Sequence, residues 1–280
     1  MKRTYIIILM LSITIAVAAQ KQKQLTILHT NDTHSCIYPL NKNLADTALA
    51  GRGGYLRRLT MIKEERIKNP DLLLLDSGDF SQGSPYYTYY KGDVEVELMN
   101  KMKYDASTIG NHEFDFGLEN MARIFKKAKF PILCSNYDFT GTPVEGLTKR
   151  WTIIRRNGMK IGLFALDPEM EGLVDQNKFV GVKYIDPVKV ANEMGDFLKN
   201  KKHCDIVICI SHMGWDSMGM NDQTIISQSR NIDLFLGGHS HTYMKQIEYH
   251  KNIDGKLIPD DQNGKHGIYV GKITINMEKK

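Results

Sequence analysis

The chain has 280 residues, 42% of them hydrophobic, so it is long enough to bury a core as one large domain or two small ones. Its formal net charge is +5 at pH 7, from 37 basic and 32 acidic residues, and the basic residues are scattered along the sequence. A composition so close to charge balance gives no indication of a groove for a nucleic-acid polymer.

Residues 1–19 have the composition of a secretory leader. Lys2 and Arg3 precede the apolar run Tyr5–Val17, and the small residues Ala16-Val17-Ala18 or Val17-Ala18-Ala19 offer a cleavage site. The run is shorter than the about 20 apolar residues that a membrane span needs, and the first cysteine after it is Cys36. We therefore predict a periplasmic or secreted protein with a cleaved signal peptide and no stable membrane anchor; an uncleaved anchor is the alternative.

The first half of the mature chain alternates apolar runs with helical patterns, which is typical of an α/β layered domain. The predicted strands are Leu25–His29, Asp71–Leu75, Asp105–Ile109 and Pro131–Ser135, and the predicted helices are Tyr55–Lys68, Gly92–Lys103 and Gly117–Lys129. The segment Phe80–Gly92 is predicted to be a loop, and it contains four tyrosines. These tyrosines either line a substrate pocket or form a half-buried cover with their hydroxyl groups in water.

The second half adds antiparallel strands. Asn157-Gly158 lies between the apolar, β-branched runs Trp151–Arg156 and Met159–Leu166, which predicts a β-hairpin. Alternation then resumes through Pro187–Asn200, Asp205–Ile210, Thr224–Ser229 and Ile232–Leu236. The tail is predicted to form antiparallel strands, Tyr243–Tyr249 and Gly267–Met277, joined by the polar loop Asn252–Lys265. We expect one domain over residues 20–280, with two mixed sheets packed together and helices outside: a four-layer α/β/β/α sandwich.

Polar, metal-competent side chains follow five of the predicted strands. They are Asp32 with His34, Asp79, Asn111 with His112 and Glu113, His212, and His239 with His241. Each group alone is weak evidence for a metal site, since a single histidine after a strand is more often a hydrogen-bonded core residue. The carboxyl ends of strands in α/β proteins are nevertheless where ligands collect, so the set together predicts a metal site. Carboxylates mixed with imidazoles suit zinc, manganese, iron or cobalt.

The four cysteines contribute less to the prediction. Cys134, Cys204 and Cys209 lie in apolar segments and are interpreted as small buried residues. Cys36, two residues after His34, is either a soft metal ligand or an ordinary loop residue. No Cys-x-x-Cys motif is present, which excludes a zinc ribbon and a dithiol redox site.

The spacing of the polar groups matches a known pattern. Five blocks carry the match: Asp32-x-His34, Gly78-Asp79, Gly110-Asn111-His112-Glu113, Ser211-His212 and Gly238-His239-Ser240-His241. They resemble the calcineurin-like metallophosphoesterases. Four longer segments are Asn31-Asp32-x-His34, Gly51–Arg58, Gly78–Pro85 and Asn111–Asp115, and they look more narrowly like the catalytic domain of exported 5′-nucleotidases and UDP-sugar hydrolases. The resemblance extends from about Leu25 to Asn276.

The resemblance implies a role for each matched residue. Asp32, His34 and His241 would hold one divalent ion, Asn111, His212 and His239 would hold a second, and Asp79 would bridge the two. The position of His241 varies among relatives between His, Gln and Asn. His112 would face the substrate phosphate, and Asp115 would orient it. Two ions about 3.5–4 Å apart can share a hydroxide and hold the attacking and leaving oxygens of an in-line displacement.

The resemblance also implies a function, a phosphomonoesterase that releases phosphate from nucleotides by means of a metal-activated hydroxide. A phosphodiesterase acting on cyclic nucleotides or nucleotide sugars would use the same site, and a non-catalytic metal-binding subunit is a third alternative. The family's nucleotidases usually carry a C-terminal nucleotide-binding domain that this sequence lacks. We expect either a separate chain that supplies that domain or a weakly selective hydrolase.

Overall fold

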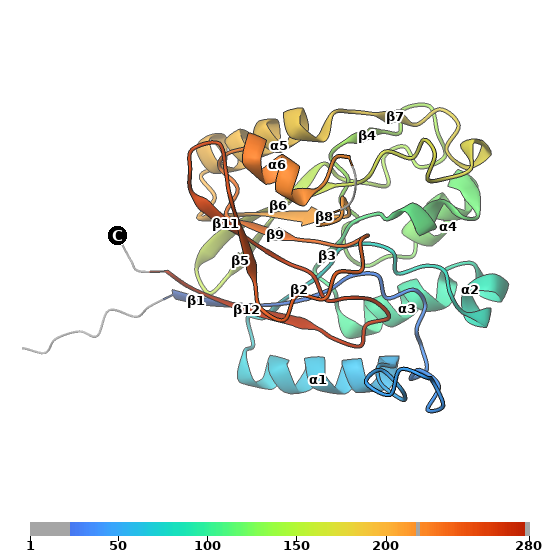
Figure 1. The fold of residues 1–280 in the computed structure, drawn as a ribbon. Helices are drawn as coiled ribbons and strands as arrows, with labels where there is room; N and C mark the ends of the chain where they lie inside the picture. The colour runs from blue at the N-terminus through green and yellow to red at the C-terminus, as the bar shows by residue number, and fades with distance from the viewer. Residues whose placement is uncertain (1–22, 217–218, 278–280) are drawn as a thin grey trace, which may run out of the picture.

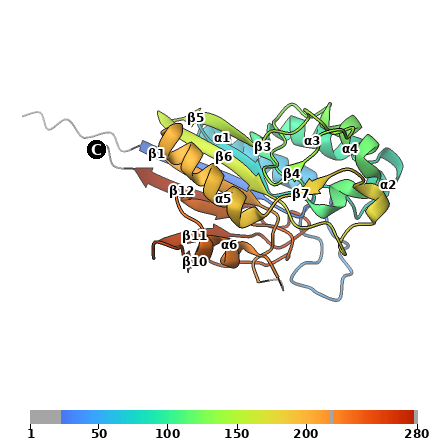
Figure 2. The ribbon, with the colours of Figure 1, turned by 90° about the horizontal axis from the view of Figure 1, so that it is seen from above.

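The protein is described here by a computed structural model that covers residues 23–216 and 219–277. These residues form stacked layers, with helices outside and two β-sheets between them (Figures 1 and 2). The leader expected at residues 1–19 lies outside the described residues.

The first sheet has four strands in the order β12-β1-β2-β3. Its strands are β1 (Lys23–Thr30), β2 (Leu73–Asp76), β3 (Ala106–Ser107) and β12 (Gly271–Met277). Strands β1, β2 and β3 are parallel, and β12 pairs antiparallel with β1, with Met277 opposite Lys23. The three parallel strands therefore present their carboxyl ends at one edge of the sheet.

The second sheet has six strands in the order β10-β11-β9-β8-β6-β5. Its strands are β5 (Trp151–Arg156), β6 (Met159–Leu166), β8 (Ile206–Ser211), β9 (Leu234–Leu236), β10 (Glu248–Lys251) and β11 (Leu257–Asp261). The predicted hairpin is confirmed, since β5 and β6 pair antiparallel around Asn157 and Gly158, whose φ angles are 45° and 69°. Strands β6, β8, β9 and β11 are parallel, so this sheet also collects its carboxyl ends at one edge.

The apolar run at β2 shows why the sheets stack. Leu73 and Leu75 face the second sheet and join the core between the sheets, where they meet residues such as Ile208. Leu72 and Leu74 point the other way, into the core beneath the helices. A strand covered on both faces needs apolar residues at every position, which explains the unbroken run.

Helices cover both outer faces of the pair of sheets. The first sheet is covered by α1 (Tyr55–Lys68), α3 (Asp93–Met102) and α4 (Gly117–Phe125), and the second by α5 (Pro187–Asp196), η3 (Phe197–Lys201) and α6 (Asp222–Gln228). Shorter elements are α2 (Pro85–Tyr90), η1 (Asn111–Phe114), η2 (Gln176–Lys178) and the strand pair β4 (Tyr137–Asp138) and β7 (Lys183–Tyr184). The predicted four-layer α/β/β/α sandwich with two mixed sheets is confirmed.

Two predicted loops contain regular structure. The segment 80–92 includes helix α2, where Ser84 accepts a hydrogen bond from the backbone N–H of Tyr87 and Pro85 occupies the first turn. The segment 252–265 includes β11. The expected pairing of the tail strands is therefore wrong, because β10 pairs with β11 in the second sheet and β12 pairs with β1 in the first. The expected strand Pro131–Ser135 forms only isolated bridges through Ile132 and Leu133.

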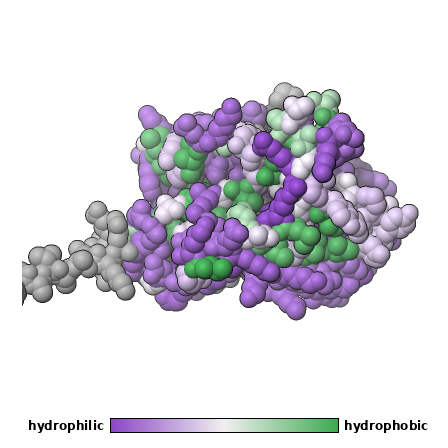
Figure 3. Space-filling model, turned by 90° about the horizontal axis from the view of Figure 1, so that it is seen from below, coloured by the Kyte–Doolittle hydropathy of each residue, from purple (hydrophilic) through white to green (hydrophobic). Residues whose placement is uncertain are grey.

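The face that carries α1 is mostly hydrophilic (Figure 3). On this face, apolar side chains form separate patches among polar ones. Within residues 23–216 and 219–277, the structure contains no helix with the length and hydropathy needed to cross a bilayer.

Candidate metal centre

The polar groups expected at the strand ends meet at the carboxyl edge of the two sheets. Asp32 follows β1, Asp79 follows β2 and Asn111 begins η1 shortly after β3. His212 and His239 follow β8 and β9 in the second sheet. The cluster, which we call the metal centre, contains all seven expected ligands: Asp32, His34, Asp79, Asn111, His212, His239 and His241.

One side of the metal centre is built from Asp32, His34 and His241. The Nε2 atoms of the two histidines are 2.9 Å apart. Asp32 Oδ1 lies 3.4 Å from Nε2 of His241 and 3.8 Å from Nε2 of His34. The three side chains can therefore direct one ligand atom each at a common point, and the expected first group is brought together.

The other side is built from Asp79, Asn111, His212 and His239. Asp79 Oδ2 lies 3.2 Å from Nε2 of His212, and Nδ1 of His239 lies 3.0 Å from Oδ1 of Asn111. Asp79, His212 and His239 can direct one ligand atom each at a second common point. The expected second group is thus also brought together.

Two carboxylates lie between the two sides. Asp79 Oδ2 is 4.0 Å from Nε2 of His34, in addition to its contact with His212. Asp32 Oδ1 reaches the second side as well, at 3.9 Å from Nε2 of His212, which the sequence did not indicate. Cys36 is not part of either side, and its Sγ contacts the carbonyl oxygen of Tyr38 at 3.2 Å.

The donor set fits divalent cations. His212 is fully buried, and its Nε2 faces Asp79 Oδ2 at 3.2 Å without the geometry of a hydrogen bond to any described residue. Burial lowers the pKa of His34, and burial together with the charge of His212 lowers the pKa of His239 to about 4. Burial opposes ionisation of Asp79, but the neighbouring histidines outweigh it and hold its pKa below the ordinary range. Burial opposes protonation of His212, but Asp79 and Asp32 outweigh it and raise its pKa well above the ordinary value. His34, His239 and Asp79 are therefore held in the neutral and ionised states that bind metal, whereas His212 would release a proton when a cation binds.

The backbone at the metal centre is unusual. Five of the seven expected ligands have a left-handed φ angle: Asp32 (47°), His34 (41°), Asp79 (52°), His239 (74°) and His241 (55°). Such conformations are uncommon for residues other than glycine and cluster at functional sites. They turn each loop sharply after its strand, which brings the side chains back over the sheet edge.

Two glycines make room for the ligands. A Cβ atom at Gly110 would lie 2.0 Å from Asp79 Oδ1, and one at Gly238 would lie 2.9 Å from His212 Nδ1. Neither position can carry a side chain without displacing a ligand. The glycine before Asn111 and the one before His239 are therefore part of the metal centre.

Glu113 supports the metal centre by binding the backbone of two neighbouring loops, a role that the sequence did not reveal. Its buried carboxylate accepts hydrogen bonds from the backbone N–H groups of Asp79 and Ser81, both at 3.0 Å, and of Gly110 at 2.6 Å. Burial and the charge of Asp79 raise the pKa of Glu113 to about 7, while the three N–H donors favour its ionised form. One carboxylate thus joins the loops that follow β2 and β3.

Replacing Glu113 with glutamine is expected to loosen these two loops. The amide would place N–H donors among three backbone N–H donors, at a cost of about 1–3 kcal/mol for buried groups left unpaired. We expect a lower Tm and less metal retained after gel filtration. Glu119→Gln, an exposed change on α4, is the matched control and should leave both unchanged. Wild-type Tm and metal content in Glu113→Gln would contradict the role.

His112 lies at the metal centre, where it, His34 and Asp79 form a further group that can direct one ligand atom each at a common point. Its Nδ1 is 3.2 Å from Oδ1 of Asp115, and its ring centroid is 5.4 Å from that of His34. Its backbone N–H donates to Asp79 Oδ1 at 2.9 Å, and the Tyr87 hydroxyl donates to its carbonyl oxygen at 3.0 Å. Burial opposes protonation, but Asp115 and Asp79 outweigh it and raise the pKa of His112. The side chain is 30% exposed, so a substrate can reach it.

A pair of buried carboxyl groups lies behind the loop that carries His239. Asp222 and Asp260 are fully buried and within hydrogen-bonding reach of each other. Ser211 donates to Asp222 Oδ1, whereas no described donor reaches Asp222 Oδ2 or either oxygen of Asp260. Burial raises the pKa of Asp222 to about 7 and, with the charge of Asp222, raises that of Asp260 further. The pair is satisfied when it shares a proton.

The carboxyl pair predicts stability that falls as the pH rises. Unfolded aspartate has a pKa of about 3.9. Between that value and the folded pKa, which is about 7 for Asp222, the folded protein binds more protons than the unfolded chain, so stability is lost across this window. In Asp260→Asn the amide can donate to Asp222, and we expect Tm in chelator to vary less with pH. The wild type and the exposed control Asp254→Asn should show the full decline. An equal decline in Asp260→Asn would count against a shared proton.

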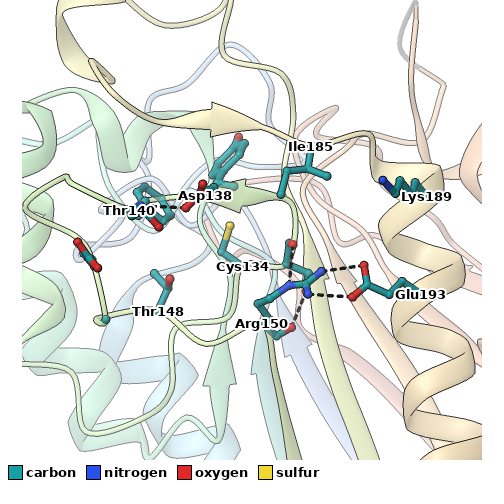
Figure 4. Close-up of a pocket in the computed structure, with 13 residues that line it drawn as sticks. Cys134, Asp138, Thr140, Thr148, Arg150, Ile185, Lys189 and Glu193 are labelled. Atoms are coloured by element: carbon teal, nitrogen blue, oxygen red, sulfur yellow. Dashed lines mark hydrogen bonds and ion pairs between the residues drawn. The ribbon is translucent and has the colours of Figure 1, made fainter.

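Another cavity, of about 460 Å³, lies away from the metal centre (Figure 4). Arg150 and Glu193 form a bidentate ion pair on its wall, with N–O distances of 2.9 and 3.1 Å. Cys134 also lies in its lining. None of the expected site residues lines this cavity. The expected site residues are gathered at the metal centre instead.

Comparison with known proteins points to the same chemistry. A family model described as calcineurin-like phosphoesterase matches residues 25–243. The human 5′-nucleotidase is 30% identical over 276 residues, which cover 92% of this chain and 47% of that protein. The solved 5′-nucleotidase precursor from Thermus thermophilus has a TM-score of 0.79 at 26% identity, over 90% of this chain and 51% of that one. The calcineurin-like phosphoesterase YfkN from Bacillus subtilis has a TM-score of 0.76 at 29% identity, over 92% of this chain and 86% of that one. The chain spans about half the length of the curated relatives it matches.

Proposed function

The chain belongs to the calcineurin-like phosphoesterase family, and from that premise we propose that it is a two-metal phosphomonoesterase acting on nucleotides. The observation that carries the proposal is the position of Asp79. Its carboxylate lies between two groups of ligands, 3.2 Å from Nε2 of His212 on one side and 4.0 Å from Nε2 of His34 on the other. A carboxylate with two oxygens can serve two cations at once.

We assign the ligands to two ions. Asp32, His34 and His241 would hold the first, Asn111, His212 and His239 the second, and Asp79 both; zinc, manganese, cobalt and iron suit this donor set. When bound, two divalent cations supply Lewis acidity that lowers the pKa of water and stabilises the charge on phosphate oxygens. Asn111 contributes a neutral oxygen, which limits the negative charge where a phosphate must approach.

We propose that His112 donates a proton to the leaving group. Asp115 binds Nδ1 at 3.2 Å, which keeps a proton on that atom and leaves Nε2 directed away from the pair. With both nitrogens protonated, Nε2–H can stabilise the leaving oxygen and donate its proton to it. The hydrogen bond from Tyr87 to the carbonyl oxygen of His112 holds this residue in place.

The extent and location of the protein form part of the proposal. Residues 20–280 would be one catalytic domain after a cleaved leader. Its relatives include a snake venom 5′-nucleotidase, which supports a location outside the cytoplasm.

The test combines metal analysis with a substrate comparison. We expect two equivalents of divalent metal per chain, hydrolysis of p-nitrophenyl phosphate and AMP, and slower hydrolysis of bis-p-nitrophenyl phosphate. Faster turnover of the diester would make the protein a phosphodiesterase. Bound metal without hydrolysis of any ester would favour a non-catalytic metal-binding subunit.

A further inference from the structure

A small cavity adjoins the metal centre. It has a volume of about 220 Å³ and is walled by the loop after β1, by the start of α2 and by His266. His34, a proposed ligand, is part of its lining, so the cavity and the metal centre share a wall. His266 ties the other wall to the centre, because its backbone N–H donates to the carbonyl oxygen of Asp32 at 2.7 Å.

The cavity is aromatic and apolar. Tyr38 and Tyr86 lie with their ring centroids 6.0 Å apart, and the Tyr86 hydroxyl donates to that of Tyr38 at 3.3 Å. Ile37, Leu40 and Pro85 add aliphatic surface. Tyr38 is 68% exposed, although an aromatic ring gains most from being covered.

The lining also restricts the charge of an occupant. The ionisable residues of this lining are two histidines, two tyrosines and Cys36; it contains no aspartate, glutamate, lysine or arginine. A phosphate would therefore stay at the metal centre, and the cavity suits a neutral, flat group attached to it. Its volume lies below the about 300–1,000 Å³ of pockets for drug-sized ligands, which limits the occupant to one ring system.

We propose that this cavity receives the nucleobase of a nucleoside monophosphate, with Tyr38 and Tyr86 as its stacking surface. The inference rests on the proposed phosphomonoesterase function and deepens it. The two tyrosines would then distinguish nucleotides from aliphatic phosphate esters. Stacking between aromatic side chains and bases tolerates different bases, so we expect little preference among them.

The test compares AMP with ribose 5-phosphate, which has the same ester bond and no base. In the metal-loaded full chain, Tyr86→Ala should lower the ratio of the two kcat/KM values about tenfold, mainly through KM for AMP. Tyr86→Phe keeps the ring and should retain most of the ratio. Tyr89→Ala, on the same helix but outside the cavity lining and 80% exposed, is the matched control and should not change it. An unchanged ratio in Tyr86→Ala overturns the inference.

Adenosine binding separates this inference from the proposed function. Adenosine lacks a phosphate, and we expect its binding to the metal-loaded chain, measured by calorimetry, to weaken about tenfold in Tyr86→Ala. If the wild type hydrolyses no phosphate ester but binds adenosine through Tyr86, the proposed function fails and the cavity assignment stands. If the wild type hydrolyses AMP while adenosine binding is the same in both proteins, the cavity assignment fails and the function stands.

Discussion

Asp79→Asn is expected to lower kcat/KM by about a thousandfold or more, since it removes the carboxylate shared by both sides of the metal centre. The amide keeps the shape of the side chain but supplies one neutral oxygen where two cations need a charged one. Metal content should fall together with activity, from two equivalents per chain to one or fewer. Excess metal in the assay should restore only part of the rate.

The control is the same aspartate-to-asparagine substitution at a position outside the metal centre. Asp138 is a half-buried aspartate in the lining of the cavity of about 460 Å³. Asp138→Asn should keep wild-type activity and metal content. Full activity in Asp79→Asn, or full loss with both ions retained at wild-type affinity, would show that Asp79 does not bridge the two sides. Metal analysis and steady-state kinetics on one preparation decide between these outcomes.

His112→Asn is expected to give the second largest effect, with the opposite pattern of metal content. Removal of a group that transfers a proton in the transition state lowers kcat by about a hundredfold to ten-thousandfold. Because both sides of the metal centre are complete without His112, metal content should stay near that of the wild type. Kinetics on a substrate with a good leaving group, such as p-nitrophenyl phosphate, should show a smaller loss than AMP.

Asp115→Asn provides the matched comparison for His112. It leaves the imidazole in place and changes only the carboxylate that orients it at 3.2 Å. We expect a smaller fall in kcat than in His112→Asn and an unchanged metal content. Loss of metal in either variant would make His112 a ligand and overturn its role as a proton donor.

The layers and the metal centre could be predicted because both follow from local patterns. The unbroken leucines of 72–75 predict a strand covered on both faces, and the carboxyl ends of parallel strands must share an edge. Polar groups placed after five such strands therefore meet, however far apart they are in sequence. The proposed roles of the individual ligands stay predictions for the experiments above.

Other features depend on long-range contacts that leave no local pattern. Strand β11 contains Pro259 and Asp260, residues that favour loops, and it forms because β9 and β10 pair on either side of it. Helix α2 does carry the Ser84-Pro85 signal of a helix start, but the tyrosines that follow obscured it. The role of Glu113 in joining two loops was missed because its partners are backbone N–H groups, which nearly every residue type provides.

The metal centre draws its ligands from both sheets and from positions as far apart as 32 and 241. A cation bound there acts as a cross-link between the two halves of the sandwich. The cross-link can form only once β9 has docked, because His239 and His241 follow that strand. Metal binding would then stabilise the docked arrangement of the two sheets.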